Sequence, residues 1–114
     1  MKTNSFKDLI VWQKSRDLAV IVYKLTEQFP RTELYGLSSQ MRRAVISISS
    51  NIAESYRRIH VRDKDRFLQI AFGSGSELES QIEISKIIFP NLSYKSAEEI
   101  LTEVMKILNK FLQG

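Results

Sequence analysis

The chain of 114 residues has no cysteine, one histidine (His60) and no long apolar run. Without cysteine there are no disulfides, thiolate nucleophiles or cysteine-ligated metals. The longest uncharged apolar run, residues 18–23, is far too short to cross a bilayer, and no run of signal-peptide length precedes Lys14. We therefore expect a soluble, cytoplasmic protein that has no membrane partner.

The residue pattern also lacks a reaction centre. A serine nucleophile needs a nearby base, which one distant histidine does not supply. A di-metal helical bundle needs Glu-x-x-His pairs, but no glutamate lies three positions before His60. The Gly-Ser-Gly-Ser run at 73–76 lacks the lysine and the preceding strand of a phosphate loop. The sequence therefore predicts a protein that is not an enzyme and uses no cofactor or metal.

What the chain does contain is helical periodicity. Only four glycines and two prolines interrupt it, and Pro30 and Pro90 each close a long periodic segment. Short connections between long helices favour antiparallel neighbours. We predict an all-α fold in a single domain, residues 1–114. It is an up-down-up-down antiparallel four-helix bundle with helices at about 8–28, 34–57, 62–88 and 94–112, the second capped by Thr32.

Apolar residues at steps of three and four mark the core-facing side of each helix. In the second helix the stripe is Leu34, Leu37, Met41, Val45, Ile48 and Ile52. In the fourth it is Ala97, Leu101, Val104, Leu108 and Phe111. The third helix carries several small residues, and Gly73 and Gly75 flank them, which predicts close approach of two helix backbones.

The first helix is apolar over an unusually wide girth. One stripe is Val11, Ser15, Leu18, Val22, Leu25 and Phe29. A second stripe beside it holds Leu9, Trp12, Ala19 and Tyr23. One intrachain contact does not need so wide a face, so we expect the protein to associate with itself. The predicted subunit contacts are Leu9, Trp12, Ala19, Tyr23 and Ile46.

Positive charge is concentrated in the first part of the chain. Residues 1–66 hold 13 Lys and Arg against 7 Asp and Glu, whereas residues 67–114 hold 4 against 6. A basic cluster bridges the second and third predicted helices: Arg57, Arg58, His60, Arg62, Lys64 and Arg66. Such a cluster suits a phosphate-bearing partner. It equally suits a solvated helix junction whose basic residues pair with Asp63 and Asp65, and the sequence leaves both open.

Three segments together carry a family pattern. They are FKDLIVWQKSRDL at 6–18, FPRTELYGLSSQMRRAVISISSNIAES at 29–55 and FLQIAFGSGSELESQIEI at 67–84. This pattern resembles the "four helix bundle protein" family, which includes proteins encoded in intervening sequences of bacterial large-subunit ribosomal RNA genes. The chain departs from it at Ser49, where proline is usual, at Ser55 and Arg57, where glycine is usual, and at His60, which is commonly a Ser or Thr cap.

The resemblance implies a four-helix subunit assembled as a homopentameric ring, with no established enzymatic activity. The family is also similar in architecture to the accessory subunit of diversity-generating retroelements, which binds nucleic acid through a basic barrel surface. Our leading hypothesis is thus an oligomeric protein that binds nucleic acid, RNA before DNA, largely without reading sequence. The predicted phosphate contacts are Arg42, Arg43, Arg57, Arg58, Arg62 and Lys64. The alternative is a protein-interaction module whose basic residues serve subunit contacts or a partner such as a nucleic-acid-processing protein.

Overall fold

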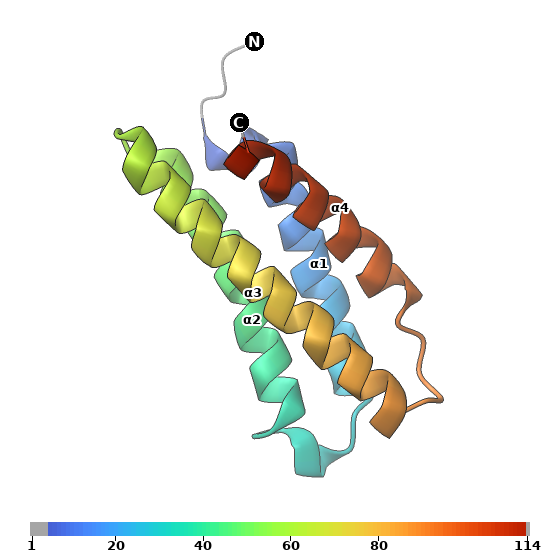
Figure 1. The fold of residues 1–114 in the computed structure, drawn as a ribbon. Coiled ribbons are helices and arrows are strands. Elements are labelled where there is room, and N and C mark those ends of the chain that lie inside the picture. The colour runs from blue at the N-terminus through green and yellow to red at the C-terminus, as the bar shows by residue number, and fades with distance from the viewer. Residues whose placement is uncertain (1–4, 114) are drawn as a thin grey trace.

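A computed structural model describes residues 5–113, which form four long helices and no strand (Figure 1). The helices are α1 (Ile10–Glu27), α2 (Leu37–Arg57), α3 (Val61–Ile88) and α4 (Lys95–Gln113). Two 3-10 turns, η1 (Phe6–Asp8) and η2 (Arg31–Glu33), precede α1 and α2. The predicted all-α four-helix bundle is confirmed. None of the helices in this described part has the length and apolarity that a bilayer crossing requires.

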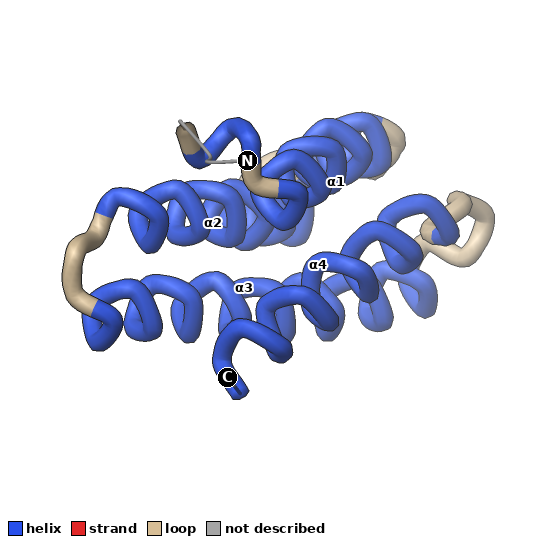
Figure 2. Tube along the Cα trace, turned by 90° about the horizontal axis from the view of Figure 1, so that it is seen from above, coloured by secondary structure: helices blue, strands red, loops and turns tan. Residues whose placement is uncertain are grey.

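The helices follow one another around the bundle. Each packs against its neighbours in the chain, and α4 closes the arrangement by packing on α1. Helices α1 and α3 therefore lie on one diagonal, and α2 and α4 on the other (Figure 2). Lys14 on α1 pairs with Glu103 on α4 at 3.0 Å. Lys86 on α3 pairs with Glu98 on α4 at 2.8 Å, a contact that raises the pKa of Lys86.

The periodic stripes form the core. All six residues of the first stripe of α1 are buried, as predicted. The stripes of α2 and α4 are buried over most of their length. One residue predicted to face the core is exposed in each: Leu34 in the stripe of α2 and Phe111 in that of α4. Leu34 lies in the turn before α2, and Phe111 lies in the last turn of α4, near the end of the bundle.

Helix α2 begins three residues later than predicted, and Thr32 does not cap it. Thr32 lies inside the turn η2, and Gly36 occupies the N-cap position. The Glu33 carboxylate accepts a hydrogen bond from the backbone N–H of Leu37 at 3.2 Å. A side chain three residues before the cap thus satisfies one of the free donors of the first turn.

On α3, the missing side chain of Gly75 leaves room for the Met105 side chain of α4. Gly75 is buried, and a Cβ added there would fall inside contact distance of Met105 Sδ and 3.2 Å from Met105 Cε. At Gly73, by contrast, an added Cβ would meet no atom within 4 Å. The nearest atoms at Gly75 belong to a side chain rather than to a backbone, and at Gly73 there are none, so neither glycine shows the predicted close approach of two helix backbones within this chain.

Tyr94 closes the C-terminal end of α3. Its hydroxyl donates to the backbone carbonyls of Ser85 at 3.0 Å and Phe89 at 2.8 Å. Carbonyls in the last turn of a helix have no partner within the helix, so this side chain satisfies groups that would otherwise need water. Burial raises the pKa of the Tyr94 hydroxyl.

The hairpin of α2 and α3 extends beyond the rest of the bundle. Helix α3 has 28 residues and so spans about 42 Å, close to the longest dimension of 43 Å. Helices α1 and α4, with 18 and 19 residues, reach only about 27–29 Å. In Figure 2 the turn joining α2 to α3 lies well past the neighbouring ends of α1 and α4.

Candidate nucleic-acid interface

The six predicted phosphate contacts fall in two separate places. Arg42 and Arg43 lie in the first half of α2 and line the same depression as Tyr23 of α1. Arg57, Arg58, Arg62 and Lys64 lie around the α2–α3 turn. The 14 residues between Arg43 and Arg57 correspond to about 21 Å along the helix. One compact phosphate site does not include both groups.

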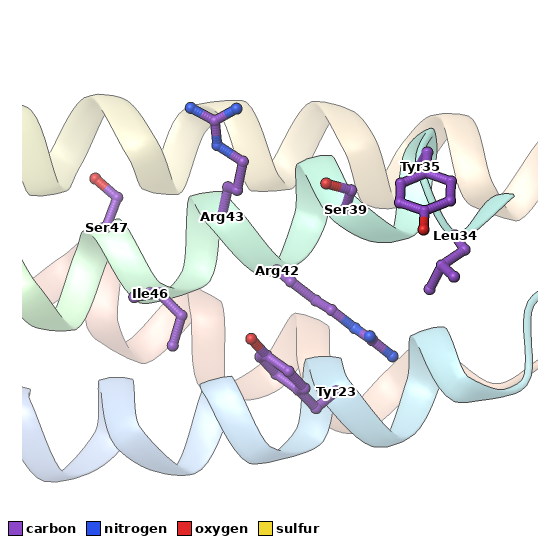
Figure 3. A pocket seen from close by; sticks show the side chains of 8 residues that line it. All are labelled: Tyr23, Leu34, Tyr35, Ser39, Arg42, Arg43, Ile46 and Ser47. Atoms are coloured by element: carbon purple, nitrogen blue, oxygen red, sulfur yellow. The ribbon is translucent and has the colours of Figure 1, made fainter.

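Arg42 is already engaged within the chain. Its Nε donates to the hydroxyl of Thr26 on α1 at 2.9 Å, and its guanidinium lies over the Tyr23 ring, 4.7 Å from the centroid. Figure 3 shows the side chain running from α2 towards α1 beside Tyr23. Thr26 is buried, so Arg42 joins two helices and has little freedom to reach an external phosphate.

Arg42 and Arg43 belong to a shallow depression that we call the α1–α2 groove. It has a volume of about 620 Å³. Tyr35 is 93% exposed, and Tyr23, Leu34 and Ile46 are also exposed. Arg43 points away from Arg42 in Figure 3 and, within residues 5–113, makes no hydrogen bond or ion pair. The groove is lined by Tyr23, Leu34, Tyr35, Ser39, Arg42, Arg43, Ile46 and Ser47.

The second place is the projecting turn, residues 57–66, which we call the hairpin tip. Arg57, Arg58, Arg62 and Arg66 are exposed there, beside Ile59 at 87%. Arg58 pairs with Glu54 at 2.9 Å. The alternative in which Asp63 and Asp65 neutralise the cluster is not met in the described part of the chain, because neither forms an ion pair there. His60 occupies the N-cap position of α3 without a side-chain cap bond.

Lys64 has a structural role at the tip. Its Nζ donates to the carbonyl of Ser55 at 3.3 Å and to that of Tyr56 at 3.4 Å. In return, the Ser55 hydroxyl donates to the carbonyl of Lys64 at 3.0 Å. These bonds satisfy carbonyls at the end of α2 and hold the start of α3 against it. Lys64 is thus engaged within the chain and is less available to contact a phosphate.

Arg66 is a basic residue of the tip that the predicted contact set omits. The guanidinium groups of Arg58 and Arg66 both lie over the ring of Phe67, at 4.7 and 5.2 Å from its centroid. One aromatic ring therefore contacts two guanidinium groups, each of which can bind phosphate by charge and forked hydrogen bonds. The neighbouring Arg-Phe pair at 66–67 is the sequence signal for this contact.

The predicted subunit contacts fall into two groups, one packed on the core of the chain and one exposed. Leu9, Trp12 and Ala19 are half-buried and pack against the chain's own core. Trp12 contacts the ring of Phe6 edge-on at 5.0 Å, so the segment before α1 covers part of it. Tyr23 and Ile46 remain exposed in the α1–α2 groove. The groove, rather than the whole second stripe of α1, is the open part of this face.

The chemistry of these places is that of binding. Among the described residues, no group of three or more His, Asp or Glu side chains is arranged to hold a metal ion. The hairpin tip offers guanidinium groups, which bind phosphate by charge and forked hydrogen bonds. The α1–α2 groove offers apolar and aromatic surface with one unpaired cation, which suits a protein surface.

The family model for the 23S rRNA-intervening sequence protein matches residues 7–110. The chain is also similar to the crystal structure of a protein of unknown function from the S23 ribosomal protein family of Bacteroides thetaiotaomicron. The TM-score is 0.84 at 26% identity, covering 95% of this chain and 99% of that one. No curated protein matches the chain. With the bundle described above, these matches show that the chain belongs to the family of 23S rRNA-intervening sequence proteins.

Proposed function

We propose that this protein is a non-enzymatic homo-oligomer, a ring of five copies, that binds nucleic acid, RNA before DNA, through the hairpin tip. The observation that carries the proposal is the exposure of four arginines on a projection that α1 and α4 do not shelter. Only one of these arginines, Arg58, is ion-paired within the described chain. Repeated around a ring, the tips present a band of positive charge to a phosphate backbone.

The contacts are expected to go to phosphates, so binding depends on salt more than on sequence. Four phosphate contacts on a single strand give a slope of about −3 in log K against log salt. Raising salt from about 50 to about 200 mM then weakens binding roughly 50-fold. Titration of a labelled RNA at these two salt concentrations measures the effect. Absence of binding at the lower concentration, or affinity that does not change with salt, contradicts the proposal.

A pair of charge-reversed variants localises the contact. Arg57→Glu with Arg62→Glu changes the tip, whereas Lys24→Glu with Arg31→Glu makes the same change in charge at the other end of the bundle. All four side chains are exposed. We expect the tip variant to lose RNA binding while keeping its oligomeric mass, and the control variant to keep most of its affinity. Equal loss in both variants contradicts a site at the tip.

The second candidate function is a protein-interaction module that acts on a nucleic-acid-processing protein. The α1–α2 groove favours it, because Arg42 is held within the chain and exposed apolar side chains surround Arg43. If the tip variant binds RNA as wild type does, and the groove variant Arg43→Glu loses a protein partner while its ring persists, this candidate is preferred.

A further inference from the structure

Helix α3 carries an exposed face that the four-helix bundle does not use. On the side of α3 away from the core, Ile84 is 46% exposed, Ile87 81% and Ile88 54%. Glu77, earlier on the same side, is exposed and has no ion pair within residues 5–113. We call this surface the outer face of α3; it consists of Ile70, Gly73, Glu77, Ser80, Ile84 and Ile87, spaced by three and four residues.

No contact within the described chain requires a glycine at position 73 on this face. A glycine in a helix interior costs about 1 kcal/mol relative to alanine. At Gly75 the cost is explained, because a Cβ there would collide with Met105. At Gly73 a Cβ would meet only open space. A missing side chain on an exposed helix face allows another backbone or a large side chain from outside to come close.

The α1–α2 groove and the outer face of α3 match in height along the bundle. The hydroxyls of Ser47 and Ser74 lie 2.7 Å apart, which fixes the register of the antiparallel helices α2 and α3. Arg43, four residues before Ser47, therefore lies near the level of residue 78, and Ile46 near that of residue 75. The turn holding Leu34 and Tyr35 precedes α2 and so lies near the C-terminal end of α3.

Each feature of the groove thus has a counterpart at the same level of the outer face. Unpaired Arg43 corresponds to unpaired Glu77, and the exposed side chain of Ile46 corresponds to the flat surface at Gly73. The exposed apolar turn at 34–35 corresponds to the apolar end of α3 at Ile84 and Ile87. Charge and shape are complementary when a second copy lies alongside and points the same way.

We propose that the α1–α2 groove of one copy receives the outer face of α3 of the next copy. Arg43 pairs with Glu77, Ile46 packs over Gly73, and the 34–35 turn covers the apolar end of α3. The two faces differ, so the contact is heterologous and repeats from copy to copy. Because α3 is diagonal to α1, the two faces are not opposite each other, so each copy is rotated relative to the last. Because the paired features lie at the same level, the copies do not climb along the bundle axis, and the contact can close into a ring.

This inference rests on the proposed homo-oligomer, and a charge swap tests the two separately. Light scattering and sedimentation velocity are measured for wild type, Arg43→Glu, Glu77→Arg and the double swap. We expect each single variant to weaken assembly at least about 10-fold, because like charges then face each other. The double swap restores assembly to within about threefold. Glu79→Arg, on the same helix but beside α4, is the matched control and assembles as wild type does.

A further variant, Gly73→Gln, distinguishes loss of assembly from loss of folding. Gly73→Gln replaces a poor helix former by a good one in open space, so the single chain is expected to keep its circular dichroism and unfolding midpoint. Its side chain occupies the space of the neighbouring copy, and assembly is expected to be lost. A wild-type protein that stays monomeric overturns both the oligomer and this contact. An oligomeric wild type with unaffected single variants, or a double swap that fails to restore assembly, overturns only the contact.

Discussion

Replacing Gly75 by alanine tests the packing of the Met105 side chain of α4 on α3. Alanine is the better helix former by about 1 kcal/mol, so the helix alone gains from the change. The new methyl group, however, enters the space of Met105 Sδ, and the thioether must move before the helices can keep their spacing. Inserting atoms into packed interiors costs about 1–3 kcal/mol. Because the clashing atoms are the far end of a flexible side chain, we expect the cost to cancel the gain and the free energy of unfolding to change by less than about 0.5 kcal/mol.

The double variant with Met105→Ala gives the decisive comparison. Once the thioether is absent, Gly75→Ala has no obstacle, and the propensity gain of about 1 kcal/mol is expected in full. The gain from the Gly75 substitution is therefore absent in the wild-type background and present in the Met105→Ala background, with a coupling of about 1 kcal/mol. Met105 is flexible and only half-buried, which keeps the clash near the low end of the overpacking range.

Chemical denaturation followed by circular dichroism measures the four proteins of this cycle. Each is compared at one protein concentration, because subunit association adds to the apparent stability. If Gly75→Ala stabilises the wild-type background and the Met105→Ala background by the same amount, the Met105 side chain does not pack against Gly75.

Three further substitutions, one of them with a matched control, test other contacts of the bundle. Arg42→Ala is expected to lower the free energy of unfolding by about 1–2 kcal/mol, because the hydrogen bond from its guanidinium to buried Thr26 is lost. The control, Arg43→Ala, is expected to change it by less than about 0.5 kcal/mol in separated chains. Equal effects of the two variants in chemical denaturation contradict this. Tyr94→Phe is expected to cost about 1–2 kcal/mol through the two carbonyls at the end of α3. Burial raises the pKa of Tyr94, so its contribution to the free energy of unfolding is complete below about pH 10 and falls as the pH rises further. In a series of denaturation measurements at rising pH, Tyr94→Phe should therefore lose less stability above about pH 10 than wild type does. Gln81→Leu is expected to be neutral or stabilising, because the buried Gln81 Oε1 has no hydrogen-bond partner in the described chain; a loss above about 1 kcal/mol contradicts that.

Periodicity predicted the fold well because burial in a bundle follows helical spacing directly. The stripe of α1 from Val11 to Phe29 is buried throughout, and the ends near Pro30 and Pro90 were placed within a few residues. The start of α2 was wrong because two local signals compete there. Thr32 is a good cap by type, but Gly36 and the Glu33 carboxylate make the cap that the chain adopts.

The sites were less predictable, because they depend on how helices are placed beside one another. Arg42 and Arg43 are adjacent in sequence, yet only the packing of α1 on α2 shows that Thr26 engages the first and leaves the second free. Likewise, Gly73 and Gly75 are equivalent by spacing, and only the position of Met105 distinguishes them. The basic cluster was found from composition, but its projection depends on the greater length of α3.

If other copies of the chain cover the α1–α2 groove and the outer face of α3, the protein in solution is larger than one chain. Multi-angle light scattering at micromolar protein tests it most directly. We expect a mass of about 66 kDa, five times the 13.2 kDa of one chain. A single species of 13.2 kDa over the whole concentration range would contradict it.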